Sequence, residues 1–295
     1  MNKGMNTYTL VADAGSTKST WCLATLQGKT KLFQTAGINP VTQDETTISD
    51  IITKELVPQL TKHVNIEDIR LNIHYYGAGC IPTLCEKMQV LLTSIFSNST
   101  VTVGSDLLGA ARAVCGHEPG IVCILGTGAN SCYYDGTDIT LHTSPLGYIL
   151  GDEGSGAYLG KRLVSDLFKG LMSEEIYQEF IKKYDLTEAE LIRKVYREPG
   201  ANFYLASFTP FLAEHRRHKE IHQLIISCFN DFFNRNINGY GAQGGTVNFV
   251  GSIALHFRDE LAEVAKAHDY TIGRIVQSPI ELMTRYHTEP FVASE

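Results

Sequence analysis

Two short turns in this chain carry residues that could bind phosphate groups. The first spans residues 13–19, Asp-Ala-Gly-Ser-Thr-Lys-Ser, and the second spans residues 126–128, Gly-Thr-Gly. Glycine lets the backbone approach a ligand closely, while N–H and hydroxyl groups donate hydrogen bonds to phosphate oxygens. Neither turn fits a Walker A loop or a dinucleotide-binding fingerprint, because required glycines are missing and a strand is expected to follow. Taken alone, a plain β-hairpin turn explains the first of them.

Acidic residues near these turns also have ordinary structural explanations. Asp13 could begin a turn by accepting hydrogen bonds from backbone amides. Asp106 stands where a helix is expected to begin, and it could cap that helix together with Ser105. Asp152 and Glu153 precede an apolar helical stretch, where acidic side chains favour a helix N-terminus. These residue types alone therefore leave catalysis and capping open.

Hydrophobic periodicity predicts the elements that position these residues. Strand-like runs at 8–12, 20–26 and 31–35 are followed by alternating helical and strand patterns up to residue 103. A similar order restarts with an apolar strand at 121–125, a small-residue turn at 126–130 that contains the second candidate phosphate turn, and another strand at 131–134. This weak internal duplication predicts two like α/β domains. After residue 154 the pattern is mainly helical, and a strand returns at 246–250.

Composition excludes several classes of protein. The chain has 295 residues, 43% hydrophobic and 19% charged, which is enough for two folded domains. A net charge of -7 with scattered basic residues argues against nucleic-acid binding. The chain shows no secretory signal and no apolar stretch long enough to span a membrane, so we expect a cytoplasmic protein. Seven cysteines occur singly and are expected to be reduced thiols.

Six segments, read in order, resemble the BadF/BadG/BcrA/BcrD-type ATPase family, specifically its N-acetylglucosamine kinase-like branch. They span nearly the whole chain, at residues 11–19, 37–40, 104–112, 125–131, 147–156 and 250–254. The stretch Leu-Gly-Asp-Glu-Gly-Ser-Gly at 150–156 is the most specific. The first turn is shared by the wider actin/hexokinase-like superfamily. The resemblance implies an α/β fold of two ribonuclease H-like (actin/hexokinase-like) domains with an interdomain cleft.

The same resemblance implies a domain division and a nucleotide site. The domains would be 1–116 and a larger 117–295, with the last helix packing back on the first domain. ATP would lie in the cleft, with Mg²⁺ held by Asp13, directly or through water. The nucleotide-binding residues would come from both turns and from a later strand-to-helix corner, namely Gly15, Ser16, Thr17, Lys18, Gly126, Thr127, Gly128, Gly251 and Ser252. An ordinary strand-to-helix turn also explains the last two.

The resemblance further implies a sugar kinase. Asp106 would be the general base that orients a sugar hydroxyl and accepts its proton. Asp152 would accept hydrogen bonds from other sugar hydroxyls. The remaining substrate contacts would come from Asn39, Ala129, Asn130 and Gly147. N-Acetylglucosamine is the expected small-molecule substrate, its 6-hydroxyl the expected acceptor, and a homodimer the expected assembly.

The chain differs from the family's sequence pattern at one segment, and two other functions are alternatives to a kinase. Many relatives have Gly-Trp-Gly where this chain has Leu-Gly-Tyr at 146–148, near the expected position of the sugar's substituent. One alternative is an ATPase activator of a radical dehydratase or reductase, which would need cluster-ligating cysteines in exposed loops. The other is a non-catalytic sugar or nucleotide sensor. The intact Asp106 and Asp152 favour a kinase over a sensor.

Overall fold

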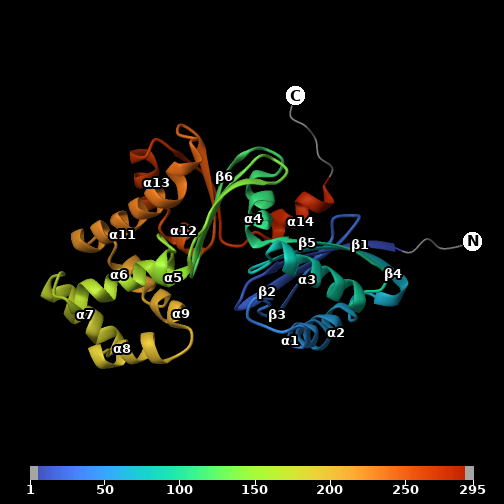
Figure 1. Cartoon of the computed structure of the whole chain (residues 1–295), viewed down its shortest axis with the longest axis horizontal. Helices are drawn as coiled ribbons and strands as arrows, with labels where there is room; N and C mark the ends of the chain where they lie inside the picture. The colour runs from blue at the N-terminus through green and yellow to red at the C-terminus, as the bar shows by residue number, and fades with distance from the viewer. Residues whose placement is uncertain (1–5, 290–295) are drawn as a thin grey trace, which may run out of the picture. The chain divides into compact units, whose positions relative to one another are not determined.

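The computed structural model describes residues 6–289, and the chain divides into two compact units (Figure 1). Within the described residues, the first unit comprises 6–117 and 278–289, and the second comprises 118–277. Each unit is built on its own five-stranded sheet and has its own hydrophobic core. In residues 6–289, no helix is both long and apolar enough to cross a membrane.

The first sheet has the strand order β3-β2-β1-β4-β5. Its strands are β1 (Asn6–Ala14), β2 (Lys18–Thr25), β3 (Thr30–Ala36), β4 (Ile69–Gly77) and β5 (Ser99–Ser105). The first three strands are antiparallel, whereas β4 and β5 continue the sheet in parallel with β1. The centre of β1 is a continuous apolar run, and Leu10, Val11 and Ala12 are fully buried. Such runs are typical of a strand covered on both faces.

Helices cover this first sheet. They are α1 (Glu45–Ile51), α2 (Val57–Leu60), α3 (Pro82–Ile95), α4 (Asp106–Cys115) and α14 (Ile280–Thr288), with a π-helical segment at Ile52–Leu56 and a short 3₁₀ turn at Ile66–Asp68. The π segment ends just ahead of Pro58, which has no N–H to continue the α-helical ladder. Ile52, Leu56 and Leu60 still reach the core.

The second sheet repeats the first strand for strand. Its order is β10-β9-β6-β7-β8, formed by β6 (Gly120–Leu125), β7 (Ala129–Tyr134), β8 (Ile139–Thr143), β9 (Thr246–Val250) and β10 (Thr271–Val276). Here β6 takes the central place of β1, antiparallel to β7 and parallel to β9. The predicted duplication and the predicted α/β class are therefore confirmed.

The second unit carries most of the helices. They are α5 (Gly147–Leu150), α6 (Gly156–Phe168), α7 (Glu174–Tyr184), α8 (Glu188–Arg197), α9 (Ala201–Ala206), α10 (Thr209–His215), α11 (Lys219–Phe232), α12 (Ser252–His256) and α13 (Arg258–Ala267), with short segments Phe233–Ile237 and Asn238–Tyr240 after α11. Leu159 and Leu163 of α6 and Phe229 of α11 are fully buried in the core. These long amphipathic helices hold the loops that follow β6 and β8.

Helix α14 returns to the first unit, where it packs on β1, β2 and α4. Its His287 ring stacks on His74 of β4, with ring centroids 3.6 Å apart and planes 7° from parallel. The Tyr76 hydroxyl lies 2.7 Å from His287 Nε2 and accepts a hydrogen bond from Arg112 of α4. Burial is the main cause that lowers the pKa of His287 to about 3 and that of His74 to about 4; the Arg112 charge contributes to both values, and His74 contributes to that of His287. Both rings are thus neutral at pH 7.

This neutral pair predicts acid sensitivity of the first unit. Because the folded-state pKa of His287 lies below the ordinary value of 6.5, the unfolded chain binds the proton more readily, and stability falls as the pH drops below about 6.5. Between pH 7 and pH 5 the wild type should lose about 1 kcal/mol more unfolding free energy than His287→Gln. Urea unfolding at both pH values measures this difference.

The matched control is His63→Gln, because the His63 side chain is exposed. This variant should keep the pH dependence of the wild type. Equal pH dependence in all three proteins would contradict a buried neutral His287.

Candidate functional site

The first predicted phosphate turn joins β1 to β2 and is fixed by backbone hydrogen bonds. Gly15 N donates to Lys18 O across the turn at 3.1 Å, and Gly37 N donates to Thr17 O at 3.2 Å. Ser16, Thr17 and Lys18 are exposed. Within residues 6–289, the N–H groups of Ser16 and Thr17 have no backbone acceptor. The turn therefore presents N–H and hydroxyl groups that could donate hydrogen bonds to an anion.

The loop after β3 lies directly against this turn. A Cβ atom on Gly37 would stand 2.3 Å from the Ser16 carbonyl oxygen, so no larger residue fits there. Asn39 Nδ2 donates to Ser16 Oγ at 2.8 Å, and Val41 N donates to Asn39 Oδ1 at 3.0 Å. The predicted sugar contact Asn39 thus lies beside the predicted phosphate turn and helps to hold it.

Asp13 and Asp106 lie at the same edge of the first sheet. Asp13 is the second-last residue of β1. Asp106 directly follows β5, which belongs to the same parallel part of the sheet as β4 and β1. Burial and, second, the negative charge of Asp106 raise the pKa of Asp13 to about 6, against an opposing effect of Lys18. Two carboxylates with one exposed lysine make this edge a place where a cation would be stabilised.

The capping explanation for Asp106 applies instead to its neighbour. Ser105 is the N-cap of α4, and its Oγ accepts a hydrogen bond from Leu108 N at 3.1 Å. Asp106 is the first residue of the helix, and its Oδ1 accepts from Leu107 N at 2.8 Å. Because Ser105 caps the helix, Asp106 is not needed for that purpose.

The second predicted phosphate turn follows β6 and receives the N-terminus of α6. Gly126 N donates to Gly128 O at 3.0 Å, which closes the turn. Gly156 N and Ala157 N of α6 donate to the carbonyl oxygens of Gly126 and Thr127. The first N–H groups of α6 are therefore already used. In the described part of the chain, Thr127 N and Gly128 N have no backbone acceptor, so the turn itself offers the donors.

The corner between β9 and α12 lies in close contact with the end of β6. Gly251 has φ +122°, and a Cβ atom there would stand 2.2 Å from the Leu125 carbonyl oxygen. Only glycine accepts both the conformation and the contact. This close approach brings Gly251 and Ser252, predicted from sequence to bind the nucleotide, next to the turn that begins at Gly126.

Asp152 also meets the second turn, although it lies in the loop between β8 and α6. Its Oδ1 accepts a hydrogen bond from Ala129 N at 3.3 Å, and its side chain is 9% exposed. Burial raises the pKa of Asp152, as does Glu153, while the Ala129 N–H and Lys161 lower it. The N-cap of α6 is Ser155, so helix capping does not account for Asp152.

Other predicted substrate residues are distributed around this carboxylate. Ala129 and Asn130, expected in the turn, are the first two residues of β7. Asn130 Oδ1 accepts from Ser131 N and lies 2.9 Å from His142 Nε2. Gly147 begins α5 and accepts a hydrogen bond from Gly151 N through its carbonyl oxygen. Asn39 and Asp106 belong to the first unit, and these residues belong to the second.

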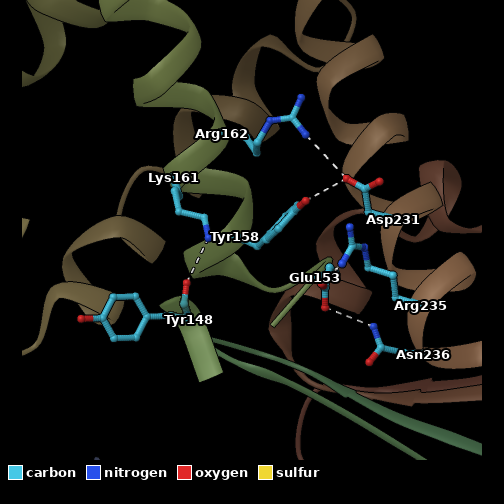
Figure 2. Close-up of polar contacts among 8 residues, drawn as sticks. All are labelled: Tyr148, Glu153, Tyr158, Lys161, Arg162, Asp231, Arg235 and Asn236. Carbon is cyan, nitrogen blue, oxygen red and sulfur yellow. Dashed lines mark hydrogen bonds and ion pairs between the residues drawn. The ribbon is translucent and has the colours of Figure 1, made fainter. Parts of the chain in front are cut away.

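Two charged residues near Asp152 carried no signal of a site role in the sequence. Glu153 follows Asp152 in the chain; it is 7% exposed, and Arg235 and Asn236 contact its carboxylate (Figure 2). Lys161 of α6 donates to the Tyr148 carbonyl oxygen at 3.0 Å. The contact of Glu153 with Arg235 joins residues far apart in the chain, and that of Lys161 depends on how α6 packs, so the motif at 150–156 is what marks this region in the sequence.

Comparisons with known proteins place the chain in a family. No protein-family model and no curated protein sequence matches it. The crystal structure of a proposed N-acetylglucosamine kinase from Porphyromonas gingivalis is 42% identical with a TM-score of 0.89, covering 95% of this chain and 98% of that one. A proposed N-acetylglucosamine kinase from Chromobacterium violaceum is 17% identical with a TM-score of 0.72, over 95% and 98% of the two chains.

A more distant structure shares the fold. The ROK family glucokinase from Streptomyces griseus, solved with glucose and AMPPNP, is 13% identical with a TM-score of 0.57, covering 96% of this chain and 98% of that one. At this identity the likeness shows the fold alone. The full-length match at 42% identity shows more. The chain belongs to the N-acetylglucosamine kinase-like family of the Porphyromonas gingivalis protein, as its six sequence motifs predicted.

Proposed function

We propose that this protein is an ATP- and Mg²⁺-dependent sugar kinase that phosphorylates N-acetylglucosamine on its 6-hydroxyl. Membership in the family of the Porphyromonas gingivalis protein supports the reaction class. The observation that carries the proposal is the pair Asp13 and Asp106, held at one sheet edge beside a turn with unused N–H donors. On the family resemblance, the protein acts in the cytoplasm as a homodimer.

Each unit carries one of the proposed nucleotide-binding turns. Ser16 and Thr17 in the first turn, and Thr127 and Gly128 in the second, have N–H groups without backbone acceptors in residues 6–289. Phosphate oxygens would accept hydrogen bonds from these groups, with Lys18 adding positive charge. Gly251 and Ser252 would contact the adenosine end.

Asp13 suits a ligand of Mg²⁺. Burial and the Asp106 charge make its ionised form costly, which a divalent cation would offset. Mg²⁺ keeps several waters and takes few protein ligands when phosphates are present, so one carboxylate suffices. When bound, the ion would neutralise charge on the transferring phosphoryl group.

Asp106 would act on the sugar hydroxyl, and Asp152 would orient the sugar. A carboxylate hydrogen-bonded to the hydroxyl can align its oxygen with the γ-phosphorus and accept the proton during transfer. Asp152 would accept hydrogen bonds from other ring hydroxyls, with Asn39, Ala129, Asn130 and Gly147 completing the substrate site. Phosphoryl transfer depends mainly on alignment and charge neutralisation, so these positioning contacts should matter as much as basicity.

The radical-enzyme activator is less well supported. Its family places a cluster-binding cysteine near the second turn, whereas Cys123 here lies inside β6 and is fully buried. A ligand to a cluster shared between subunits would need to be accessible. A sensor would bind its ligand without turnover, so steady-state kinetics distinguish it from a kinase.

The first prediction from this proposal concerns the base. Asp106→Asn should lower kcat for N-acetylglucosamine phosphorylation by about 10²- to 10⁴-fold, because the hydroxyl loses its proton acceptor. The affinity for ATP should change less than about threefold, since Asp106 acts on the sugar. Steady-state kinetics and calorimetric titration with AMPPNP measure the two effects.

The control for this variant is Asp259→Asn, because Asp259 is an exposed aspartate in the first turn of another helix, α13. Its kinetics should match the wild type. Turnover near the wild-type rate in Asp106→Asn would refute the assignment of the base.

A second prediction concerns Asp13. Its pKa of about 6 lies above the ordinary 3.8, so the folded state holds the proton more tightly and wild-type stability falls as the pH rises through this interval. Asp13→Asn removes that effect, so it should raise stability by about 1 kcal/mol more at pH 7.5 than at pH 5. Urea unfolding without nucleotide provides the measurement.

The same variant should respond weakly to ligand. Mg²⁺ with AMPPNP should raise the melting temperature of the wild type clearly more than that of Asp13→Asn. The comparison protein is again Asp259→Asn. Two results together would contradict both roles of Asp13. They are an Asp13→Asn variant less stable than the wild type at pH 7.5, and stabilisation of that variant by Mg²⁺ and AMPPNP as strong as that of the wild type.

A further inference from the structure

The loop between β8 and α6 holds its predicted sugar residues in a conformation that the chain disfavours. Leu146 has φ +58° and Asp152 has φ +55°, both in the left-handed region, and Gly147 and Gly154 adopt the same region. Residues other than glycine enter this region at a cost in free energy. The loop therefore needs contacts that stabilise it, and its geometry decides where Asp152 lies.

Hydrophobic burial in the middle of the loop comes from Tyr148, which is half-buried and packs against the core, whereas its apolar neighbours are exposed. The side chains of Leu146, Ile149 and Leu150 are 62%, 72% and 72% exposed. The short helix α5 has a single turn, so most of its carbonyl groups lack a helical partner. Polar contacts must therefore add to the packing of Tyr148 to hold this segment.

The polar contacts are mostly local, with two exceptions. Asp152 N donates to Pro145 O at 2.9 Å, and Gly151 N donates to Gly147 O at 2.8 Å, both within the loop. Ala129 N reaches the Asp152 side chain from β7. Lys161 Nζ reaches the Tyr148 carbonyl oxygen from the second turn of α6, as Figure 2 shows. Through Lys161, the long helix α6 is hydrogen-bonded to the α5 segment.

We propose that Lys161 is a positioning residue for the sugar, because its ammonium group fixes the loop that carries Gly147 and Asp152. This inference rests on the proposed function, in which Asp152 binds sugar hydroxyls. Lys161 does not touch the sugar in this account. It acts through the Tyr148 carbonyl group and through its charge.

The charge of Lys161 supports the same role. In residues 6–289, no carboxylate oxygen lies within 4 Å of its ammonium group, so no close ion pair neutralises it. Lys161 lowers the pKa of Asp152, while burial and Glu153 raise it. Glu153 is itself paired with Arg235. Lys161 thus favours the carboxylate form of Asp152, which accepts hydrogen bonds from hydroxyls.

The test compares Lys161→Met, which keeps the aliphatic stem, with Lys161→Arg, which keeps the charge and the donors. Loss of a charge-assisted hydrogen bond should raise KM for N-acetylglucosamine about tenfold or more in Lys161→Met. KM for ATP should stay within about twofold. The acid limb of the kcat/KM profile for the sugar should move to higher pH, and Lys161→Arg should restore most of both properties.

Amide hydrogen exchange gives a readout that does not need activity. In Lys161→Met, residues 145–152 should exchange faster than in the wild type, while the rest of α6 keeps its protection. Lys169→Met is the matched control, because Lys169 is exposed at the C-terminal end of the same helix. It should leave exchange and kinetics unchanged.

The outcomes separate this inference from the proposed function. A wild type that phosphorylates no sugar would overturn the proposed function, while exchange in residues 145–152 would still report on the Lys161 contact. An active wild type, with unchanged sugar KM, pH profile and loop exchange in Lys161→Met, would overturn the role of Lys161. Equal rises in KM for sugar and ATP would do the same, because they would indicate a general structural defect.

Discussion

Close backbone contact at the ends of the strands is the constraint on which both predicted phosphate turns depend. At Gly37 a side chain would collide with the Ser16 carbonyl group, and at Gly251 it would collide with that of Leu125. Each glycine lets a neighbouring loop lie directly on the backbone beside a turn. The turns keep their shape through these contacts and through backbone hydrogen bonds, which leaves several N–H groups for a ligand.

The acidic residues follow from the same arrangement. Parallel strands end at one edge of a sheet, so Asp13 near the end of β1 and Asp106 just after β5 come near each other, and the Asp106 charge helps to raise the pKa of Asp13. In the second unit, Asp152 is brought to the start of β7 by a loop with left-handed residues. Carboxylates that are partly buried with few cations nearby are suited to bind a metal ion or hydroxyl groups.

Much of this fold could be predicted from the sequence, because strand periodicity and small-residue turns are local signals. The strands at 121–125 and 246–250 match β6 and β9 within one residue at each end, and the repeated strand order confirms the duplication. The capping roles were harder to assign. Ser105 and Ser155, rather than the acidic residues beside them, cap α4 and α6, and only the hydrogen bonds distinguish such neighbours.

Contacts that depend on how the elements pair and pack could not be predicted in this way. Ala129 belongs to β7 because it pairs with Leu125, which shortens the turn to three residues. The contact of Lys161 with Tyr148 depends on how α6 packs, and no local pattern marks a lysine on an amphipathic helix as special. The roles of the individual site residues stay predictions, since their ligands are what would test them.

The most direct measurement of the central claim is ATP consumption by the purified protein with a panel of hexoses and acetamido sugars, with the products identified by mass spectrometry and NMR. The account predicts Mg²⁺-dependent turnover that N-acetylglucosamine stimulates most, with ADP and N-acetylglucosamine 6-phosphate formed in equal amounts. ATP hydrolysis that no sugar stimulates, or no turnover with any sugar, would contradict it.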